Sequence, residues 1–367
     1  MRRKKDRVLR ALQIEVTSRC TRSCSVCPRS QLSERWIDGD LTEGLWKLLE
    51  PGLDLAEHVH LQGWGEPLLH PKLPTWAARA REAGCTIGIT TNGDLLPDAL
   101  SWLVEGAVDL ITISTAGYKG SHSRLRDNSE FIRVIYYAHE LIVKLREHGV
   151  KAKVKLSYLL TRSNAHELPM AVRAASDAGI DELYVIHLDC RTSAFQFAES
   201  AFSGRSLTPG VDAYLKEAEK SARRNRIRFR GPAANGEKVL ACALNPMHFA
   251  FITWRGLVGP CTYLLLPIEG AIPRWDESGM RHVDPVAWGD LNQEPLSRIM
   301  GSDLRTRFVE PFGRRLAAED RFLKALDLEQ SVRALRAIDD AVKERRRALE
   351  ENPFPGSCTG CPKSLGW

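Results

Sequence analysis

Short apolar runs alternate with amphipathic segments over residues 12–187. Runs of about five apolar or β-branched residues predict buried strands, whereas apolar positions three and four residues apart predict helices. The predicted strands are residues 12–17, 58–61, 86–90, 110–114, 151–160 and 183–187, and the helices between them are residues 42–49, 73–83, 96–106, 130–148 and 167–178. Alternation of strand and helix predicts a parallel sheet with helical crossovers. The expected fold class is therefore α/β, an open or closed barrel.

The pattern changes near residue 190. Residues 191–209 predict a polar loop, 210–224 a helix and 226–230 a short basic strand. Residues 241–266 have a strand-like pattern with cysteines, a Pro-, Gly- and Trp-rich stretch extends to residue 289, and helices are predicted at 295–300 and 320–349. We expect a core at 1–200, a linker helix and strand at 201–235, and a small α+β domain at 236–367.

Composition narrows the class of protein. The chain has 367 residues, 43% of them hydrophobic, and a net charge of +6, which suits a large buried core and excludes a disordered chain. The apolar stretch at 257–268 is shorter than the roughly 20 residues of a membrane span, and no apolar segment follows the basic N-terminus. We expect a cytoplasmic protein without membrane contact. The basic clusters at 2–5, 223–230 and 343–347 accompany no recognition module, so nucleic acid is not an expected partner.

Seven of the nine cysteines are clustered, which in a reducing cytosol indicates metal binding rather than disulfides. Cys20, Cys24 and Cys27 follow the first predicted strand. Three thiolates on one loop can hold three corners of a cubane iron–sulfur cluster and leave the fourth iron open. A zinc or adventitious metal site is the alternative. Cys85 and Cys190 stand alone and are expected to be small buried hydrophobic residues.

The spacing Cys-x3-Cys-x2-Cys after the first strand resembles the radical S-adenosylmethionine (SAM) superfamily. Three further segments follow predicted strands in the order of that family. Gly65-Glu66-Pro67 is similar to its Gly-Gly-Glu-Pro turn, which binds the amino group of SAM, Thr91-Asn92-Gly93 to its Thr-Asn-Gly turn, and the segment from Ser114 to Gly117 to its Ser-Leu-Asp-Gly segment. Arg126 stands where members often place a SAM-contacting arginine.

This resemblance implies a partial (β/α)6 TIM-like barrel in which SAM is contacted by Gly65, Glu66, Pro67, Asn92, Ser114 and Arg126. It also implies one-electron cleavage of SAM at a 4Fe–4S cluster held by Cys20, Cys24 and Cys27, giving a 5′-deoxyadenosyl radical that abstracts hydrogen from a substrate. For Asn92 and Ser114 the alternative is an ordinary role in turns.

Two positions differ from the family pattern. Trp64 replaces the first glycine of the Gly-Gly-Glu-Pro turn, and Val26 stands where an aromatic residue usually precedes the third cysteine. Neither position is a cluster ligand, so both predict local differences in packing.

Cys242, Cys261, Cys358 and Cys361 resemble a C-terminal extension of the same superfamily called SPASM, in its truncated or twitch form. That form has one cysteine, a Gly-x4-Cys hairpin, here Gly256 to Cys261, and a late Cys-x2-Cys pair. The resemblance implies one auxiliary 4Fe–4S cluster bound by four thiolates. A structural zinc site is the alternative, because four thiolates with a Cys-x2-Cys half are also typical of zinc.

The expected function is that of a radical SAM oxidoreductase with SAM and two 4Fe–4S clusters as cofactors and a reductant such as flavodoxin or ferredoxin. An auxiliary cluster beside the cavity can accept an electron from a substrate radical, so we expect net two-electron oxidation, as in a dehydrogenase. A peptide maturase that forms a thioether or carbon–carbon crosslink is the alternative, and the substrate is accordingly a small molecule or a peptide.

A third interpretation is a non-catalytic iron–sulfur or zinc protein. Glu66, Asn92 and Ser114 argue against it, because an electron carrier has no use for a SAM cavity. His187, Asp189 and Cys190 end the last predicted strand of the barrel and are candidate substrate-side groups, with a simple strand-end turn as the alternative. The sequence assigns no catalytic residue.

Overall fold

A ten-stranded sheet forms the centre of the computed structural model, which describes residues 7–232, 239–326 and 332–367. The strand order is β14-β11-β10-β1-β2-β3-β4-β5-β6-β9. The strands are β1 Leu9–Ile14, β2 Ala56–Leu61, β3 Thr86–Thr91, β4 Leu110–Thr115, β5 Lys153–Leu160, β6 Glu182–His187, β9 Arg228–Arg230, β10 Phe249–Ile252, β11 Leu257–Gly259 and β14 Gly289–Asp290. Neighbours from β10 to β9 are parallel, and β11 and β14 are antiparallel.

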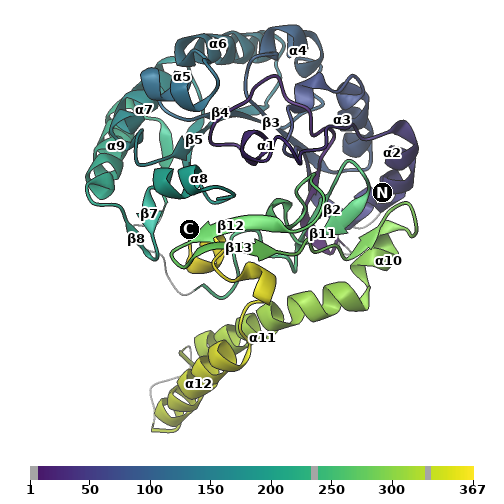
Figure 1. Ribbon diagram of the computed structural model, residues 1–367, viewed down its shortest axis with the longest axis vertical. Coiled ribbons are helices and arrows are strands. Elements are labelled where there is room, and N and C mark those ends of the chain that lie inside the picture. The colour runs from purple at the N-terminus through teal and green to yellow at the C-terminus, as the bar shows by residue number, and fades with distance from the viewer. Residues whose placement is uncertain (1–6, 233–238, 327–331) are drawn as a thin grey trace.

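Helices follow the strands and lie on the outside of the curved sheet (Figure 1). They are α2 Glu43–Leu49, α3 Leu73–Glu82, α4 Leu96–Leu103, α5 Gly120–Leu125, α6 Phe131–Glu147, α7 Leu168–Asp177 and α9 Val211–Asn225. The short helix α1 Pro28–Gln31 lies within the ring of strands in this view. The expected α/β fold, an open TIM-like barrel, is confirmed.

The two faces of the sheet differ in polarity. On the outer face, apolar side chains such as Leu12, Val59 and Ile111 are fully buried against the helices. The inner face is polar, and a cavity of about 290 Å³ along it is lined by residues that include Gln13, His60, Thr90, Thr112, Lys155 and Tyr184. TIM barrels usually fill their interior with branched apolar side chains. This barrel instead keeps polar space between its strands, which leaves room for a ligand.

Two segments after β6 contain more regular structure than expected. The predicted loop at 191–209 includes helix α8 Ala194–Glu199 and the hairpin β7 Phe202–Ser203 with β8 Ser206–Leu207. The Ser193 hydroxyl caps α8 by accepting a hydrogen bond from the backbone N–H of Gln196. The Pro-, Gly- and Trp-rich stretch carries a second hairpin, β12 Ile272–Asp276 with β13 Gly279–Val283, and the short helix α10 Leu296–Met300 follows where a helix was predicted.

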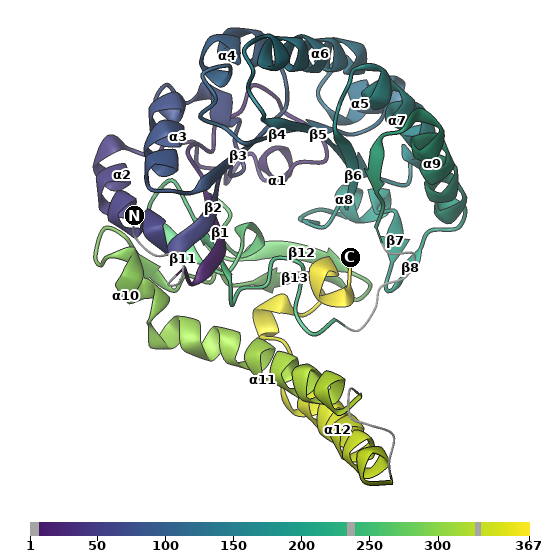
Figure 2. The ribbon, with the colours of Figure 1, turned by 180° about the vertical axis from the view of Figure 1, so that it is seen from behind.

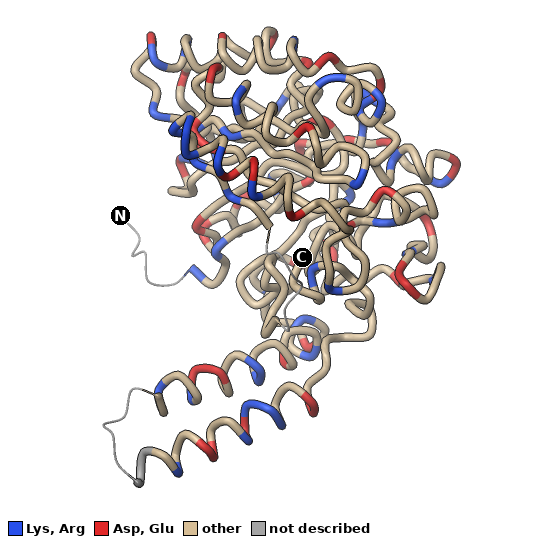
Figure 3. Tube along the Cα trace, turned by 90° about the vertical axis from the view of Figure 1, so that its left-hand side faces the viewer, with Lys and Arg blue, Asp and Glu red and all other residues tan. Residues whose placement is uncertain are grey.

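The single charged helix predicted at 320–349 is wrong. The structure has two long helices, α11 Asp303–Leu326 and α12 Val332–Glu351, which pack side by side and project from the barrel (Figures 1 and 2). Lys and Arg alternate with Asp and Glu along both helices (Figure 3). Ion pairs join them, for example Arg321–Glu344 at 2.7 Å and Arg345–Glu319. The basic residues at 343–347 therefore have acidic neighbours.

The sheet continues across the predicted domain borders. The predicted linker supplies α9 and β9 at one edge of the sheet, and the predicted C-terminal domain supplies β10, β11 and β14 at the other. Residues 233–238, which contain the border at 235, and the basic cluster at 2–5 lie outside the described residues. The division into domains stays a prediction. Within the described residues, every helix is too short or too polar to cross a membrane.

Candidate functional site

The first cysteine loop is held rigidly at the carboxyl end of β1. The N–H of Cys27 donates to the carbonyl of Cys24 at 3.0 Å, and Pro28 then begins α1. The amide of Gln196, on α8, donates to the carbonyl of Val26 at 3.0 Å. Asn92 Nδ2, after β3, donates to Thr21 Oγ1 at 2.9 Å and lies 3.7 Å from Cys20 Sγ. Contacts from α8 and from the end of β3 therefore fix the loop that carries Cys20, Cys24 and Cys27.

Burial makes this loop a poor place for free thiolates. It raises the pKa of the Cys27 thiol to about 12, with the nearby Cys24 adding to the shift, and it also raises the pKa of Cys20. Crowded, buried thiolates are stable only beside positive charge, and the irons of a cluster provide it. The donor set, three soft sulfurs on one loop, therefore fits three corners of a cubane cluster.

The turn at Gly65, Glu66 and Pro67 packs directly against this loop. A Cβ at Gly65 would lie 2.4 Å from the carbonyl oxygen of Arg19, so only glycine allows this approach. The Glu66 carboxylate is buried and accepts hydrogen bonds from the N–H of Leu68 at 3.1 Å and of Asn92 at 2.7 Å. Glu66 thus joins the ends of β2 and β3. Burial raises its pKa, and the backbone donors oppose that shift.

A cavity of about 220 Å³ opens beside the cysteine loop at the carboxyl ends of the strands. Of the residues predicted to bind the cluster or SAM, Cys24, Cys27 and Arg126 line it. Arg126 also donates to the carbonyl of Ser114 at 2.8 Å. Gly65, Glu66, Pro67 and Asn92 shape the turns behind the cysteine loop instead. The structure thus gathers the predicted residues at one end of the barrel, and their contact with SAM stays a prediction.

The far wall of the cavity comes from the end of β6 and from the C-terminal region. His187, Asp189 and Cys190, which the sequence indicated as candidates, line it. Tyr263 lines it as well and donates to Asp189 Oδ2 at 3.1 Å, and Lys363 Nζ lies 2.7 Å from the same oxygen. Tyr263 and Lys363 were missed by the sequence reasoning. The available signal was their position two residues after Cys261 and Cys361.

His187 is unusual among these residues because it is buried and neither ring nitrogen has a hydrogen-bond partner in the part of the chain that the structure describes. The rings of Phe202 and Trp367 each lie 4.9 Å from its ring, edge to face. Burial lowers the pKa of His187 to about 4, and Asp189 opposes the shift. The imidazole is therefore neutral at pH 7 and offers one donor and one acceptor.

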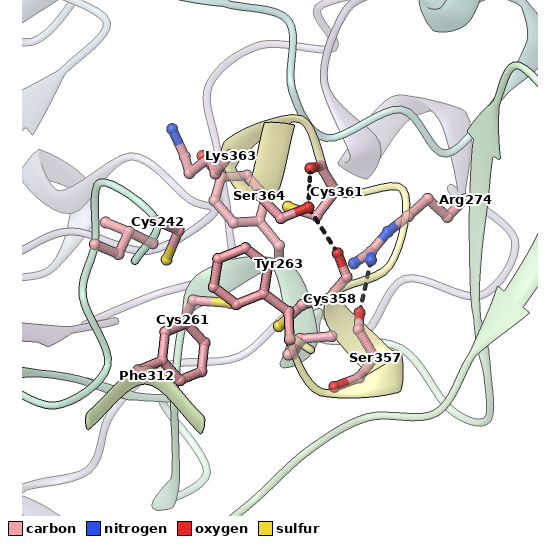
Figure 4. A pocket seen from close by; sticks show the side chains of 13 residues that line it. Cys242, Cys261, Tyr263, Arg274, Phe312, Ser357, Cys358, Cys361, Lys363 and Ser364 are labelled. Atoms are coloured by element: carbon pink, nitrogen blue, oxygen red, sulfur yellow. Dashed lines mark hydrogen bonds between the residues drawn. The ribbon is translucent and has the colours of Figure 1, made fainter. Parts of the chain in front are cut away.

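The four C-terminal cysteines converge on a second pocket (Figure 4). Cys242 precedes β10, Cys261 follows β11, and Cys358 and Cys361 follow α12. The Ser364 hydroxyl donates to the carbonyls of Cys358 at 3.0 Å and Cys361 at 2.7 Å, which fixes the turn between them. Tyr263 and Phe312 form part of the wall. Four thiols from distant segments thus meet at one place.

The electrostatics of this second pocket also fit a metal–thiolate centre. Burial raises the pKa of Cys242 and Cys261, and it raises the pKa of Cys358 to about 12; nearby thiols add to each shift. Two cations lie alongside: the buried Arg274 donates to the carbonyl of Ser357 at 2.7 Å, and the half-buried Lys363 also lines the pocket. In the described parts of the chain, no three His, Cys, Asp or Glu side chains are arranged to hold a single metal ion. A cubane needs wider spacing, because each thiolate binds a different iron.

Comparison with known proteins agrees with this geometry. Residues 14–175 match the model of the radical SAM superfamily. The tungsten-containing aldehyde ferredoxin oxidoreductase cofactor-modifying protein of Pyrococcus furiosus is 26% identical over 309 residues, covering 82% of this chain and 83% of that protein. The SAM-dependent 2-deoxy-scyllo-inosamine dehydrogenase of Niallia circulans is 30% identical over 155 residues, covering 40% of this chain and 62% of that protein.

Among solved structures, Streptococcus suis SuiB bound to SAM superposes with a TM-score of 0.60 at 13% identity, covering 83% of this chain and 68% of that one. At this identity the likeness concerns the fold, which is the same open barrel. The matched family model, in contrast, identifies a radical SAM domain at residues 14–175. The match to this domain supports SAM and one 4Fe–4S cluster as cofactors.

Proposed function

We propose that this enzyme oxidises a small-molecule substrate by two electrons in net, with Cys20, Cys24 and Cys27 as ligands of the SAM-binding cluster. The remaining clustered cysteines, Cys242, Cys261, Cys358 and Cys361, hold one auxiliary 4Fe–4S cluster. The observation that carries the proposal is the 220 Å³ cavity, because it is bounded by Cys24 and Cys27 on one side and by Tyr263, close to Cys261, on the other. A substrate in this cavity lies between the two cysteine sites.

The residues of the chain divide the work between the two ends of the cavity. When bound, SAM and its cluster supply a 5′-deoxyadenosyl radical, and the chain supplies orientation and exclusion of water. Gly65, Glu66 and Pro67 form the turn against the cysteine loop, Asn92 holds that loop, and Arg126 faces the cavity from the Ser114 carbonyl. These are the groups that we propose position SAM.

The opposite wall is suited to a hydroxyl-bearing substrate. His187 is neutral, and its donor and its acceptor have no partner among the described residues; the charge of Asp189 is offset by Lys363. Two relatives support a small molecule over a peptide: one is a dehydrogenase of an aminocyclitol, and the other is a cofactor-modifying protein. The reductant, flavodoxin or ferredoxin, stays a prediction.

The test begins with SAM cleavage by anaerobically reconstituted protein, with dithionite in place of the protein reductant. Wild-type protein should release 5′-deoxyadenosine, and Cys24→Ala should release none, because one corner of the cubane is lost. Cys85→Ala is the matched control, since that buried thiol donates to the carbonyl of Leu53 at 3.2 Å and belongs to neither site. Equal release by wild-type protein and Cys24→Ala would contradict the ligand assignment.

The oxidation itself is tested with 2-deoxy-scyllo-inosamine and related aminocyclitols as candidate substrates. The expected product is lighter by two hydrogens, and one 5′-deoxyadenosine is formed for each product. Cys358→Ala combined with Cys361→Ala should retain SAM cleavage and lose the product. A folded double variant that still forms full product would refute an electron-accepting role for the C-terminal site, and a crosslinked peptide as the product would favour the maturase.

A further inference from the structure

Arg191 carries a buried charge without a partner. It follows β6 and Cys190, its residue is 2% exposed, and none of its three guanidinium nitrogens has a hydrogen-bond partner among the described residues. The rings of Phe197 and Phe202 hold the guanidinium from 5.2 Å each. Cation–π contacts do not replace the lost hydration of a buried cation, so an unpaired guanidinium at this depth indicates a missing anionic neighbour.

The acidic side chains around Arg191 are bound elsewhere. Those whose charge acts on it are Glu277, Asp276 and Asp189. Glu277 accepts from the N–H of Gly204 at 2.6 Å, Asp276 from the N–H of Ser278 at 2.8 Å, and Asp189 from Lys363 and Tyr263. The anion that Arg191 lacks is therefore not supplied by these carboxylates.

Two contacts connect the segment of Arg191 with the segments that carry the C-terminal cysteines. Its carbonyl accepts from the N–H of Trp275 at 2.8 Å, and the preceding Arg274 lines the cysteine pocket. Phe202, which holds the guanidinium, stacks on Trp367 at 4.8 Å, in the segment that follows Cys361. The charge of Cys361 itself acts on Arg191. Figure 4 shows Arg274 pointing toward the turn between Cys358 and Cys361.

The two cations that line this pocket already have partners. Lys363 pairs with Asp189, and Arg274 donates to the carbonyl of Ser357. A cubane with four thiolate ligands is anionic and becomes more so on reduction, so an uncommitted buried cation stabilises its reduced state. We propose that Arg191 is a positioning residue that neutralises the metal–thiolate centre of Cys242, Cys261, Cys358 and Cys361 and raises its reduction potential. The inference rests on the auxiliary cluster of the proposed function.

The experiment measures the C-terminal cluster alone. Full-length protein with Cys20, Cys24 and Cys27 changed to Ala is reconstituted, its iron and zinc are measured, and the cluster is titrated with dithionite while its paramagnetic signal is followed. Adding Arg191→Gln should lower the ratio of reduced to oxidised cluster at a fixed potential about tenfold, which equals about 59 mV for a one-electron couple. Arg191→Lys, which keeps the charge, should restore most of the difference.

Two further variants serve as a charge control and as a substitute for Arg191→Gln. Arg230→Gln removes the same charge from an arginine that also lies over an aromatic ring, 5.0 Å from Tyr184 on β6, and should leave the potential unchanged. Phe197→Leu removes one of the rings that hold the guanidinium of Arg191 but keeps the charge. It should shift the reduction potential in the same direction as Arg191→Gln, and it replaces that variant if Arg191→Gln does not fold.

The outcomes separate the two proposals. Iron in the pocket with an unchanged potential in Arg191→Gln, or in Phe197→Leu if Arg191→Gln does not fold, overturns the role of Arg191 alone. Zinc in place of iron after reconstitution overturns the auxiliary cluster and with it the redox role. A lowered potential that Arg191→Lys restores supports both.

Discussion

Glu15 is a fully buried carboxyl group at the end of β1, and it joins three segments around the site. One carboxyl oxygen accepts from the N–H of Trp64 at 2.9 Å, and the other from the N–H of Trp254 at 3.4 Å. A Cβ on Gly63 would clash with the Glu15 side chain, so the turn before Glu66 packs directly against this side chain. Trp64, which departs from the family pattern, is thus held in place by a residue that the sequence did not indicate.

The buried state of Glu15 predicts a pH dependence of stability. Burial raises its pKa from 4.5 to about 7, against the hydrogen bonds from Trp64 and Trp254. Between these values the unfolded chain releases the proton and the folded chain keeps it, so stability falls as pH rises from about 4.5 to 7 and then levels off. Between pH 4.5 and 7 the shifted pKa of Glu15 lowers the free energy of unfolding by about 3 kcal/mol. Glu15→Gln should remove this slope from the urea midpoint measured by circular dichroism at pH 5, 6 and 7.5.

Glu57→Gln is the control for this prediction, because Glu57 lies on β2 and is exposed. Histidines with lowered pKa values titrate in the same range, but they contribute equally to wild-type protein and to both variants. Identical pH slopes for wild-type protein and Glu15→Gln would contradict the prediction, because they would show that folding does not raise the pKa of Glu15.

Residue roles were predictable from the sequence only where the chemistry is local. Cys20, Cys24 and Cys27 lie on one loop, so their spacing alone indicated a cluster. The ion pair between Lys363 and Asp189 joins positions that are far apart in the sequence, and no local pattern reports it. The unpartnered state of Arg191 is likewise a property of the assembled fold.

At the scale of elements, the sequence was most informative where the helices of the barrel end at glycine. Gly84, Gly149 and Gly179 have φ of +84°, +68° and +80°, a conformation that favours glycine and ends a helix. α8 escaped prediction because its six residues are too short to show a helical period. Residues 320–349, which include the end of α11 and most of α12, were predicted as one helix because both parts have the same charged, amphipathic pattern, and the first part of α11 was not predicted.

The hairpin of α11 and α12 is expected to be dispensable for both metal sites. Its base is closed by the rings of Phe312 and Phe354, 5.0 Å apart, and by Arg315, which lies 3.9 Å from the Phe354 ring. The rest projects away from the barrel (Figure 2). Replacing residues 319–345 with a short Gly-Ser linker should therefore leave iron content and release of 5′-deoxyadenosine unchanged.

The contrasting variant for the hairpin is Phe312→Ala at its base. Phe312 is buried and lines the C-terminal cysteine pocket. Losing a buried phenyl ring costs about 3–5 kcal/mol, so this variant should lose iron from one site. If the shortened hairpin loses the same iron, the hairpin supports the cluster along its whole length.

At the scale of the whole molecule, the alternation of strand and helix was enough to predict the barrel, but not how its edges are completed. β10 pairs with β1 over Ala11–Ile14 and Phe249–Ile252, and the N–H of Arg10 donates to the carbonyl of His248 at 2.8 Å. The apolar run that forms β10 does not show which strand it joins. The predicted core and the predicted C-terminal domain therefore share one sheet. Cys242 and Cys261 of the cysteine pocket lie next to β10 and β11, at the edge of the sheet that ends in β14.

This shared sheet predicts that residues 1–235 do not form a stable unit. Without β10, the edge of β1 exposes unpaired backbone groups, and the buried Leu12 and Ile14 lose their neighbours Ala250 and Ile252. We expect the fragment to aggregate or to lose hydrogen-exchange protection in β1, measured by mass spectrometry against the full chain. The chain with the shortened hairpin is the matched control, since it keeps β10 and should protect β1 fully. A soluble fragment that binds one cluster and cleaves SAM at the rate of the full chain would show that the barrel folds without β10, and that the predicted border near residue 235 separates independent domains.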